Sequence, residues 1–341
     1  MRYFPKPVAG LLCLVAMACA GCSAESSGGS ASATTTPSAS TPSATATAES
    51  TTTYAPYVDA TSASDLDDAG SAAAYNLAFV IADGSDCTPA WNGTTAIDDS
   101  SVKSRVSALT ESGASVRVSF GGADGKELAE ACDSASALAE AYGAALDAAG
   151  STEADFDVEG DALADSDSVS LRSKAIALLQ EDRPDLSVSF TLPVMPDGLD
   201  DDGVALLESA NDHSVQVSTV NIMTMNYASS YGGDMGDYAE EAASATHEQL
   251  MDVFGTSDST AWGALALTSM LGVNDVDNET FTLEDAAQVR EFADDKGVAW
   301  VSMWAAFRDR ACDEDSSSDD PLTNCSGIEQ EDGAFGEAFS G

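Results

Sequence analysis

Apolar runs alternate with polar loops and helical patterns along most of the chain. Eight of these runs have the length of a β-strand: Tyr54–Ala60, Asn76–Ala82, Ser115–Phe120, Ala154–Glu159, Leu186–Leu192, Val217–Met223, Trp262–Thr268 and Val298–Trp304. Ala-rich stretches with helical spacing lie between several of them: Ser101–Ser112, Gly125–Ala149, Val169–Glu181, Met235–Val253, Leu283–Asp294 and a weak last one, Gly333–Phe339. This alternation predicts an α/β fold, a (β/α)8 TIM barrel in one domain, with a doubly wound sheet as the alternative.

The first 22 residues have the pattern of an export signal. Arg2 and Lys6 precede the apolar run Val8–Ala18, which is too short to span a membrane as a stable helix. Small residues before Cys22 resemble the lipobox of bacterial lipoproteins, although Cys19 stands where Leu is usual. We therefore expect a lipidated Cys22 and an exported protein that contacts the membrane only through this lipid. An ordinary signal peptide cleaved nearby is the alternative.

Residues 23–53 consist mainly of Ser, Thr, Ala and Pro. Such a segment has too few apolar side chains to form a core, so we expect a disordered linker. The folded domain is then expected at residues 54–341.

The composition is strongly acidic, with 58 acidic and 13 basic residues and a formal charge of −45. This charge repels phosphate backbones and excludes nucleic acid as a partner. A neutral polymer or a small molecule fits better, although solubility alone also explains the charge. We expect a monomer.

Two of the seven cysteines leave with the signal, and Cys22 would carry the lipid. The other four, in an exported domain, predict two disulfides with three possible pairings. The short separation of Cys312 and Cys325 favours a local bridge, which leaves Cys87 to pair with Cys132. A zinc site is the alternative, but no CxxC spacing supports it. We expect no metal and no cofactor.

The segment Glu153–Gly160 carries the strongest chemical signal. On a strand, Asp155, Asp157 and Glu159 share one face. Like charges so close raise at least one pKa, and a carboxyl that stays protonated near neutral pH suits a general acid. An acidic strand end or a calcium site would explain the row otherwise. The row follows the fourth strand, where TIM barrels place their active sites, so we favour catalysis.

Several motifs resemble those of glycoside hydrolase family 18 chitinases. Ala154–Gly160 is similar to the DxxDxDxE signature, and Ser119-Phe120-Gly121-Gly122 is similar to the SxGG motif. Val220–Tyr227 resembles the strand-six segment, and Trp304 matches the Trp that ends the last barrel strand. The resemblance extends from Tyr54 to Cys325 and implies a TIM-barrel catalytic domain.

Two positions depart from the family pattern. Thr152 stands at the first Asp of the signature, and Asn226 stands where strand six usually carries Asp. Asn keeps the hydrogen-bonding shape of Asp and loses its charge. If Asn lowers activity, Asn226→Asp should raise it or move the pH optimum. The family's M-x-Y motif begins at either Met223 or Met225.

The resemblance implies substrate-assisted retaining hydrolysis, in which the acetamido group of the sugar attacks its own anomeric carbon. Glu159 would be the general acid/base. Asp157 would orient the acetamide and stabilise the oxazolinium ion, and Asp155 would share a proton with Asp157.

The resemblance also implies a set of substrate-binding residues: Ser119, Met223, Met225, Asn226, Tyr227 and Trp304. Ser119 would hydrogen-bond Asp155, Tyr227 would hold the acetamido carbonyl, and Trp304 would form a floor under the sugar.

The implied activity is cleavage of β-1,4 links between N-acetylglucosamine units, with chitin or its oligosaccharides as substrate. Two alternatives remain: an inactive, lectin-like sugar-binding protein on the same fold, and an endo-β-N-acetylglucosaminidase acting on N-glycans. Inactive relatives commonly lack the acid, so the presence of Glu159 favours an enzyme.

Overall fold

The computed structural model describes residues 52–313, 316–317 and 320–341, which belong to one compact unit, Glu49–Gly341. The expected signal at 1–22, the lipidated Cys22 and the linker up to residue 51 lie outside the described residues and stay predictions. The folded part begins slightly before the expected boundary, because Thr52 is buried and its hydroxyl donates to the carbonyl of Val298 at 2.8 Å. Among the described helices, none is long and apolar enough to cross a membrane.

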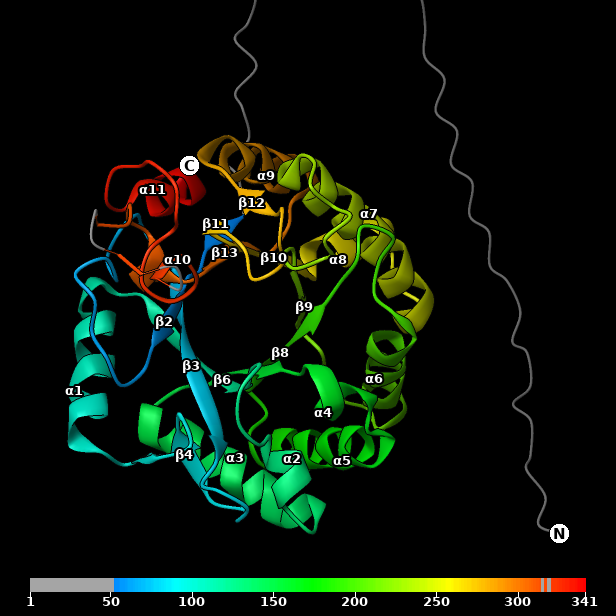
Figure 1. Ribbon diagram of the computed structural model, residues 1–341. Helices are drawn as coiled ribbons and strands as arrows, with labels where there is room; N and C mark the ends of the chain where they lie inside the picture. Colours follow the sequence, from blue (N-terminus) through cyan, green and yellow to red (C-terminus); the bar gives the residue numbers. More distant parts are fainter. Residues whose placement is uncertain (1–51, 314–315, 318–319) are drawn as a thin grey trace, which may run out of the picture. The chain divides into compact units, whose positions relative to one another are not determined.

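Parallel strands form the centre of the molecule, with helices around them (Figure 1). The strands are β1 Thr53–Tyr54, β2 Tyr57–Asp59, β3 Ala74–Ala82, β6 Ser115–Gly121, β7 Glu153–Asp157, β8 Ser187–Pro193, β9 Thr219–Met223, β10 Leu265–Met270 and β13 Trp300–Trp304. Their order is β1-β13-β10-β9-β8-β7-β6-β3, and β2 pairs with β3. The first predicted strand is therefore two pieces, interrupted at Ala55-Pro56, and no continuous strand closes the ring.

The sheet is mixed, which corrects the expectation of a purely parallel barrel. β4 (Pro89–Trp91) runs antiparallel to β3, and β5 (Thr95–Ala96) runs antiparallel to β4. A separate hairpin joins β11 (Gly272–Val273) to β12 (Thr280–Phe281). Strands of two or three residues are too short to produce a visible periodicity in the sequence, which is why they were missed.

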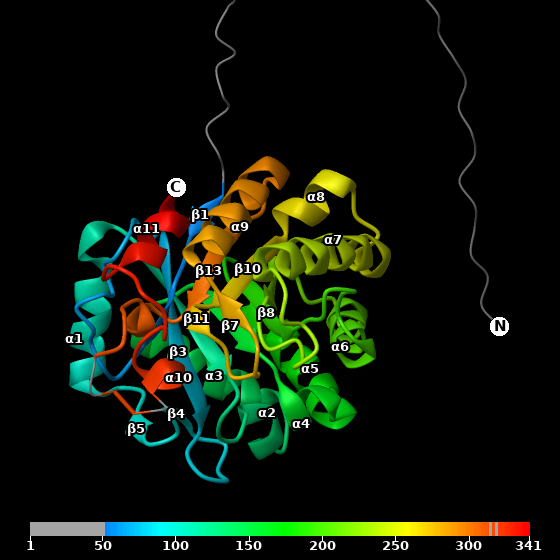
Figure 2. The ribbon, with the colours of Figure 1, turned by 45° about the horizontal axis from the view of Figure 1, so that its top comes forward.

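Helices surround the strands, and the tilted view of Figure 2 shows α5, α6, α7 and α8 along the right side. Their bounds are α1 Ser100–Leu109, α2 Leu128–Ala131, α3 Ala135–Ala149, α4 Gly160–Ala164, α5 Ser166–Asp182, α6 Asp201–Asp212, α7 Met235–Phe254, α8 Asp258–Gly263, α9 Leu283–Lys296, α10 Asp320–Thr323 and α11 Ala334–Ser340, with 3-10 turns at Thr110–Ser112 and Ala306–Arg308.

The structure differs from the expected helices and strands at three places. The stretch Gly125–Ala149 is two helices, because α2 ends at an extended Cys132 and Ser134 caps the start of α3. Trp262 belongs to α8, and the following strand begins only at Leu265. Helix α6 was not expected.

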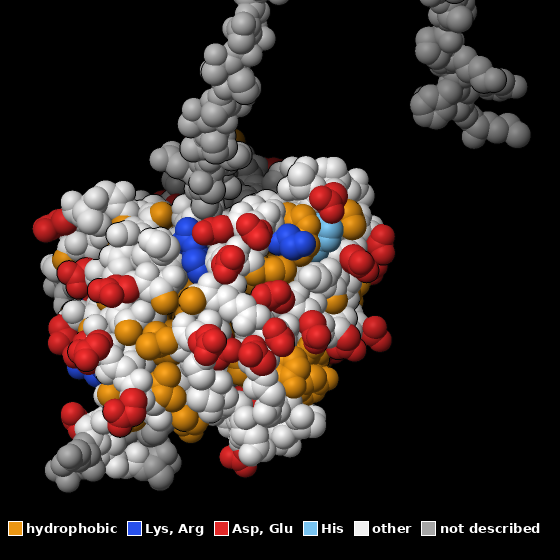
Figure 3. Space-filling view, turned by 90° about the horizontal axis from the view of Figure 1, so that it is seen from above, with side chains coloured by type: hydrophobic (Ala, Val, Ile, Leu, Met, Phe, Trp, Pro, Cys, Tyr) orange, Lys and Arg blue, Asp and Glu red, His pale blue; other side chains and the backbone are white. Residues whose placement is uncertain are grey.

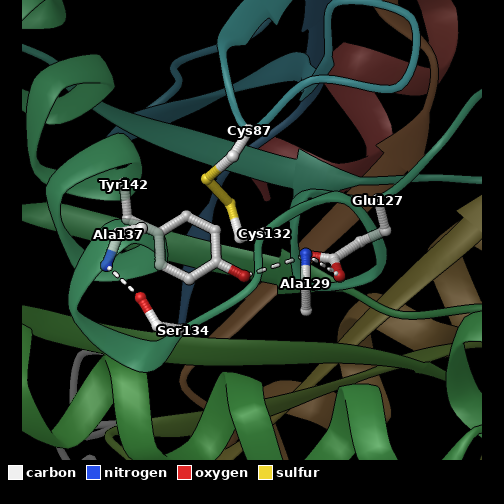
Figure 4. Close-up of a disulfide and its surroundings, with 7 residues drawn as sticks. All are labelled: Cys87, Glu127, Ala129, Cys132, Ser134, Ala137 and Tyr142. Atoms are coloured by element: carbon white, nitrogen blue, oxygen red, sulfur yellow. Dashed lines mark hydrogen bonds between the residues drawn. A yellow bond between two sulfur atoms is a disulfide. The ribbon is translucent and has the colours of Figure 1, made fainter.

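Both expected disulfides are confirmed, Cys87–Cys132 and Cys312–Cys325. Figure 4 shows the first of them beside α2, where Tyr142 donates a hydrogen bond to Glu127 at 2.9 Å. The expected acidic surface is visible in Figure 3, where Asp and Glu side chains are spread over the face shown and few Lys or Arg side chains appear.

Alternation along β7 separates a core face from a chemical face. Phe156 is fully buried and packs on Phe120, Tyr142 and Phe190, with ring centroids 5.3, 4.9 and 5.8 Å away. The residues on either side of it, Asp155 and Asp157, must then point to the opposite side of the sheet. The aromatic core therefore determines where the carboxylates point.

Candidate active site

Asp155 lies at the centre of a buried network of hydroxyl groups. Its Oδ2 accepts from Ser119 at 2.7 Å and from Tyr57 at 3.0 Å, and its Oδ1 accepts from Ser189 at 2.6 Å and from Thr191 at 2.9 Å. Ser119 and Ser189 are the register partners of Asp155 on β6 and β8. The expected contact of Ser119 with Asp155 is present, and the carboxylate is held rigidly in place.

Asp157 follows Asp155 on the same face of β7 and lies beside Glu159. Asp157 is 4% exposed, and its Oδ1 has no hydrogen-bond partner among the described residues. Burial raises the pKa of Asp157 well above its usual value, and the charges of Glu159 and Asp155 raise it further. A hydrogen bond with Glu159 also raises the pKa of Asp157.

Glu159 follows β7 as the residue before α4, with an extended backbone at φ −130° and ψ 164°. The alternation therefore continues past the end of the strand. Burial raises the pKa of Glu159; the hydrogen bond from Asp157 opposes this, and the charges of Asp124 and Asp275 add to it. A carboxyl group with a raised pKa is able to carry a proton into a reaction near neutral pH.

The two glycines after Ser119 are required by close packing. Gly121 has φ +102°, and a Cβ there would lie 2.0 Å from the backbone oxygen of Asp157. A Cβ at Gly122 would lie 2.8 Å from the ring of Phe79. Only glycine allows β6 to approach the carboxylate row so closely.

Trp304 ends β13 and is half-buried. Its ring lies 5.9 Å from that of Tyr57, whose hydroxyl donates to Asp155, and 5.5 Å from the ring of Phe79, which stacks on it. The expected floor residue is therefore joined through Tyr57 to the carboxylate row. Tyr57 and Phe79 were not singled out, because isolated aromatics in apolar strands do not differ from core residues in sequence.

The segment after β9 carries the other expected site residues. Met225 and Tyr227 are buried and Met223 is half-buried. The hydroxyl of Tyr227 has no hydrogen-bond partner within the described part of the chain, and burial raises its pKa. Tyr231 and Tyr238 pack on the Tyr227 ring, each at 5.9 Å.

Asn226 faces the loop after β10. Its Nδ2 donates to Asp275 Oδ2 at 2.9 Å, and its Oδ1 accepts from the backbone N–H of Asp275 at 3.0 Å. Asp275 acts electrostatically on both Glu159 and Arg308, and Arg308 donates to the carbonyl of Trp304 at 2.9 Å. Asp275 was missed, because the contacts that connect it to the row come from loops far apart in the sequence.

The structure therefore places the acid row, the aromatic floor and Asn226 at the carboxyl ends of the parallel strands, where barrel enzymes place their chemistry. A cavity of about 780 Å³ lies elsewhere, between residues 63–72 and α1, and contains none of the expected site residues. The site thus combines a buried, unpaired oxygen of Asp157 with the carboxyl group of Glu159, whose pKa is raised by burial.

No family model matches the chain. Two curated relatives do. One is a probable bifunctional chitinase/lysozyme of Escherichia coli (strain K12), 33% identical over 275 residues. The other is endochitinase 11 of Metarhizium anisopliae, 32% identical over 274 residues. Both matches cover 75% of this chain, which spans 31% of the first relative and 52% of the second.

Solved structures agree with these relatives. The catalytic domain of a hyperthermophilic chitinase from Pyrococcus furiosus is 31% identical, with a TM-score of 0.73 over 84% of this chain and 93% of that one. A family GH18 chitinase from Chromobacterium violaceum, at 16% identity and a TM-score of 0.53 over 75% of this chain and 79% of that one, shares the fold. With a carboxylate row at the strand ends and this identity over nearly the whole Pyrococcus domain, the chain belongs to the glycoside hydrolase family 18 chitinases.

Proposed function

We propose that the protein hydrolyses β-1,4 links between N-acetylglucosamine units, with chitin or its oligosaccharides as substrate. One observation carries this proposal. A buried oxygen of Asp157 has no hydrogen-bond partner among the described residues, and it lies beside Glu159, whose pKa is raised by burial. A buried acceptor left unpaired costs stability unless a ligand supplies the donor. An acetamide N–H is such a donor.

The mechanism uses two carboxyl groups in different roles. Protonated Glu159 donates to the glycosidic oxygen as the bond to the anomeric carbon breaks. The acetamido carbonyl oxygen of the same sugar attacks this carbon and forms a cyclic oxazolinium ion. Asp157 accepts the acetamide N–H and offsets the positive charge. Glu159 then takes a proton from water as the water oxygen attacks the anomeric carbon. The bond from this carbon to the acetamido oxygen breaks, so the acetamido group is restored and the configuration is retained overall.

Tyr227 and Trp304 complete the proposed sugar site. The unpaired hydroxyl of Tyr227 is suited to donate to the acetamido oxygen and keep it in position for attack. The half-buried ring of Trp304 is proposed as an apolar surface on which the C–H face of a pyranose packs. Met223, Met225 and Asn226 belong to the same loop and are proposed to shape this end of the site.

The relatives support the same substrate class. A Pyrococcus furiosus chitinase domain, 31% identical to this chain, is described in complex with chito-oligosaccharides. The Escherichia coli relative is named a probable chitinase and lysozyme. Both names describe those proteins, and they support an N-acetylglucosamine polymer as the substrate proposed here.

The test is turnover of chito-oligosaccharides by the Glu159→Gln variant. Gln keeps the size and the hydrogen bonds but cannot donate the proton, so we expect kcat to fall by about 10²–10⁴-fold, or about 3–5 kcal/mol in the barrier. Glu181→Gln makes the same change on the exposed surface of α5 and should leave kcat unchanged. Analysis of the first product should give the retained anomer.

Other outcomes select the alternatives. If Glu159→Gln keeps wild-type turnover, Glu159 is not the acid. If the wild type binds the oligosaccharides without cleaving them, the lectin-like alternative holds. Cleavage of N-glycans in preference to chito-oligosaccharides would favour the endoglycosidase.

A further inference from the structure

The loop after β10 contacts the loop that carries Tyr227. Residues 271–282, which include the β11–β12 hairpin, separate β10 from α9. Within it, Glu279 is 1% exposed, although carboxylates are seldom so deeply buried without a function or a partner. No role is assigned to Glu279 by the mechanism above.

Glu279 binds the backbone next to Tyr227. Its Oε1 accepts the N–H of Ala228 at 2.9 Å. Asn226, two residues before Ala228, adopts φ +57°. This backbone conformation is one that Asn accepts more readily than most residues.

A side chain of the Tyr227 loop also binds the backbone of the loop after β10. The Asn226 side chain accepts from the backbone N–H groups of Asp275 at 3.0 Å and Val276 at 3.3 Å, and donates to the Asp275 carboxylate. Asn278 donates to the carbonyl of Ser229 at 3.3 Å. Each loop therefore holds the backbone of the other through a side chain.

Tyr227 depends on this arrangement for its position. Its buried hydroxyl has no protein partner in the described chain, so no hydrogen bond from its own side chain fixes it. The rings of Tyr231 and Tyr238 pack on the Tyr227 ring and limit its tilting. How far the Tyr227 hydroxyl extends towards the substrate then depends on the position of the Tyr227 backbone. That backbone is the part held by Glu279.

We propose that Glu279 is a positioning residue that holds the Asn226–Ala228 backbone so that the Tyr227 hydroxyl meets the acetamido group of the substrate. The proposal rests on the proposed function for the group that Tyr227 meets, but the contact between Glu279 and the loop stands independently. It also gives the loop after β10 a role in catalysis rather than only in folding.

The kinetic test is a double-mutant cycle of Glu279→Ala and Tyr227→Phe with chito-oligosaccharides. A misplacement of about 1 Å lowers rates by about 100-fold, so Glu279→Ala should lower kcat by about this factor and change KM less. Combined with Tyr227→Phe, it should add little further loss, because both changes act through one hydroxyl. Additive losses, or a wild-type kcat in Glu279→Ala, would overturn the proposal.

Two matched variants separate positioning from general damage. In Glu279→Gln the amide oxygen still accepts the N–H of Ala228, so kcat should stay within about threefold of wild type. Asp277→Ala removes an exposed carboxylate from the same loop and should change nothing. A Glu279→Gln variant as slow as Glu279→Ala would contradict the backbone contact as the cause.

Hydrogen exchange tests the contact without any substrate. The amides of residues 226–228 should exchange faster in Glu279→Ala than in wild type, Glu279→Gln or Asp277→Ala, at equal melting temperature. If the wild type proves inactive on chito-oligosaccharides, the proposed function fails, and exchange still decides the contact. Unchanged exchange in Glu279→Ala would overturn it.

Discussion

Asp155 and Asp157 are two residues apart on one strand and yet lie in opposite environments. Asp155 receives hydroxyl groups from four residues on three neighbouring strand segments, whereas Asp157 retains an unpaired buried oxygen and faces Glu159. Both oxygens of Asp155 therefore already accept hydrogen bonds within the protein, whereas one oxygen of Asp157 remains available to a ligand. Buried sites that leave a polar atom unpaired are typically functional and are maintained at a cost in stability.

This cost predicts a pH-dependent effect of Asp157→Asn on stability. The pKa of Asp157 is raised in the folded protein, mainly by burial. Its contribution to stability is therefore full below the unfolded pKa of about 3.9 and is lost as pH rises through the folded pKa. Asn is neutral throughout and loses nothing over this range.

The melting temperature of Asp157→Asn should consequently exceed that of wild type by an amount that grows from pH 3 towards neutral, while turnover falls. Thermal melts between pH 3 and pH 8 measure the difference. Glu181→Gln, on the exposed face of α5, should show no such trend. A difference that stays constant with pH would contradict the assignment of a raised pKa.

At the scale of elements, the loop after β10 changes how Asn226 is interpreted. The sequence comparison suggested that Asp at this position would restore a missing charge. In the structure, Nδ2 of Asn226 lies 2.9 Å from the Asp275 carboxylate, and Asp275 acts on Glu159. Asp124 and Asp275 therefore already supply negative charge near Glu159.

We accordingly expect Asn226→Asp to lower activity. Two carboxylates would face each other at hydrogen-bonding distance, and the lost contact and the repulsion together cost about 1–2 kcal/mol, or about tenfold in kcat/KM. The swapped pair Asn226→Asp with Asp275→Asn restores one amide and one carboxylate and should recover most of this loss. An Asn226→Asp single variant faster than wild type would restore the original interpretation.

At the scale of the whole molecule, the two disulfides stabilise segments of different length. Cys87–Cys132 joins residues 45 positions apart, whereas Cys312–Cys325 joins residues 13 positions apart. The longer bridge encloses β4, β5, α1, β6 and α2, and hence the Ser119–Gly122 motif. A longer closed loop restricts the unfolded chain more strongly.

Replacing both cysteines of the long bridge by serine should lower the free energy of unfolding by about 4 kcal/mol, and the same change in the short bridge by about 3 kcal/mol. Urea unfolding of the two double variants under non-reducing conditions gives the comparison. Since neither bridge touches the carboxylate row, turnover at low temperature should persist in both. A larger loss from the short bridge would contradict the order.

Local patterns in the chain were sufficient for much of this protein. A strand lies in each of the eight predicted regions, although the first is divided in two and the seventh begins only at Leu265, and both disulfides were predicted correctly. Apolar runs, period-two alternation and cysteine spacing are properties of short segments, which is why they were sufficient here. The contact of Ser119 with Asp155 was expected from the family resemblance. Family resemblance supplied the roles of the site residues, which stay proposals.

Contacts between distant loops were decided only by the folded chain. Asn226 and Asp275 are 49 positions apart, and Ala228 and Glu279 are 51 apart, so no periodicity relates them. Asp155 accepts hydrogen bonds from four hydroxyl groups on other strands, and these partners are likewise far from it in the sequence. Which polar atom stays unpaired depends on every neighbour in three dimensions, and this is why the available acceptor of the site could be identified only after folding.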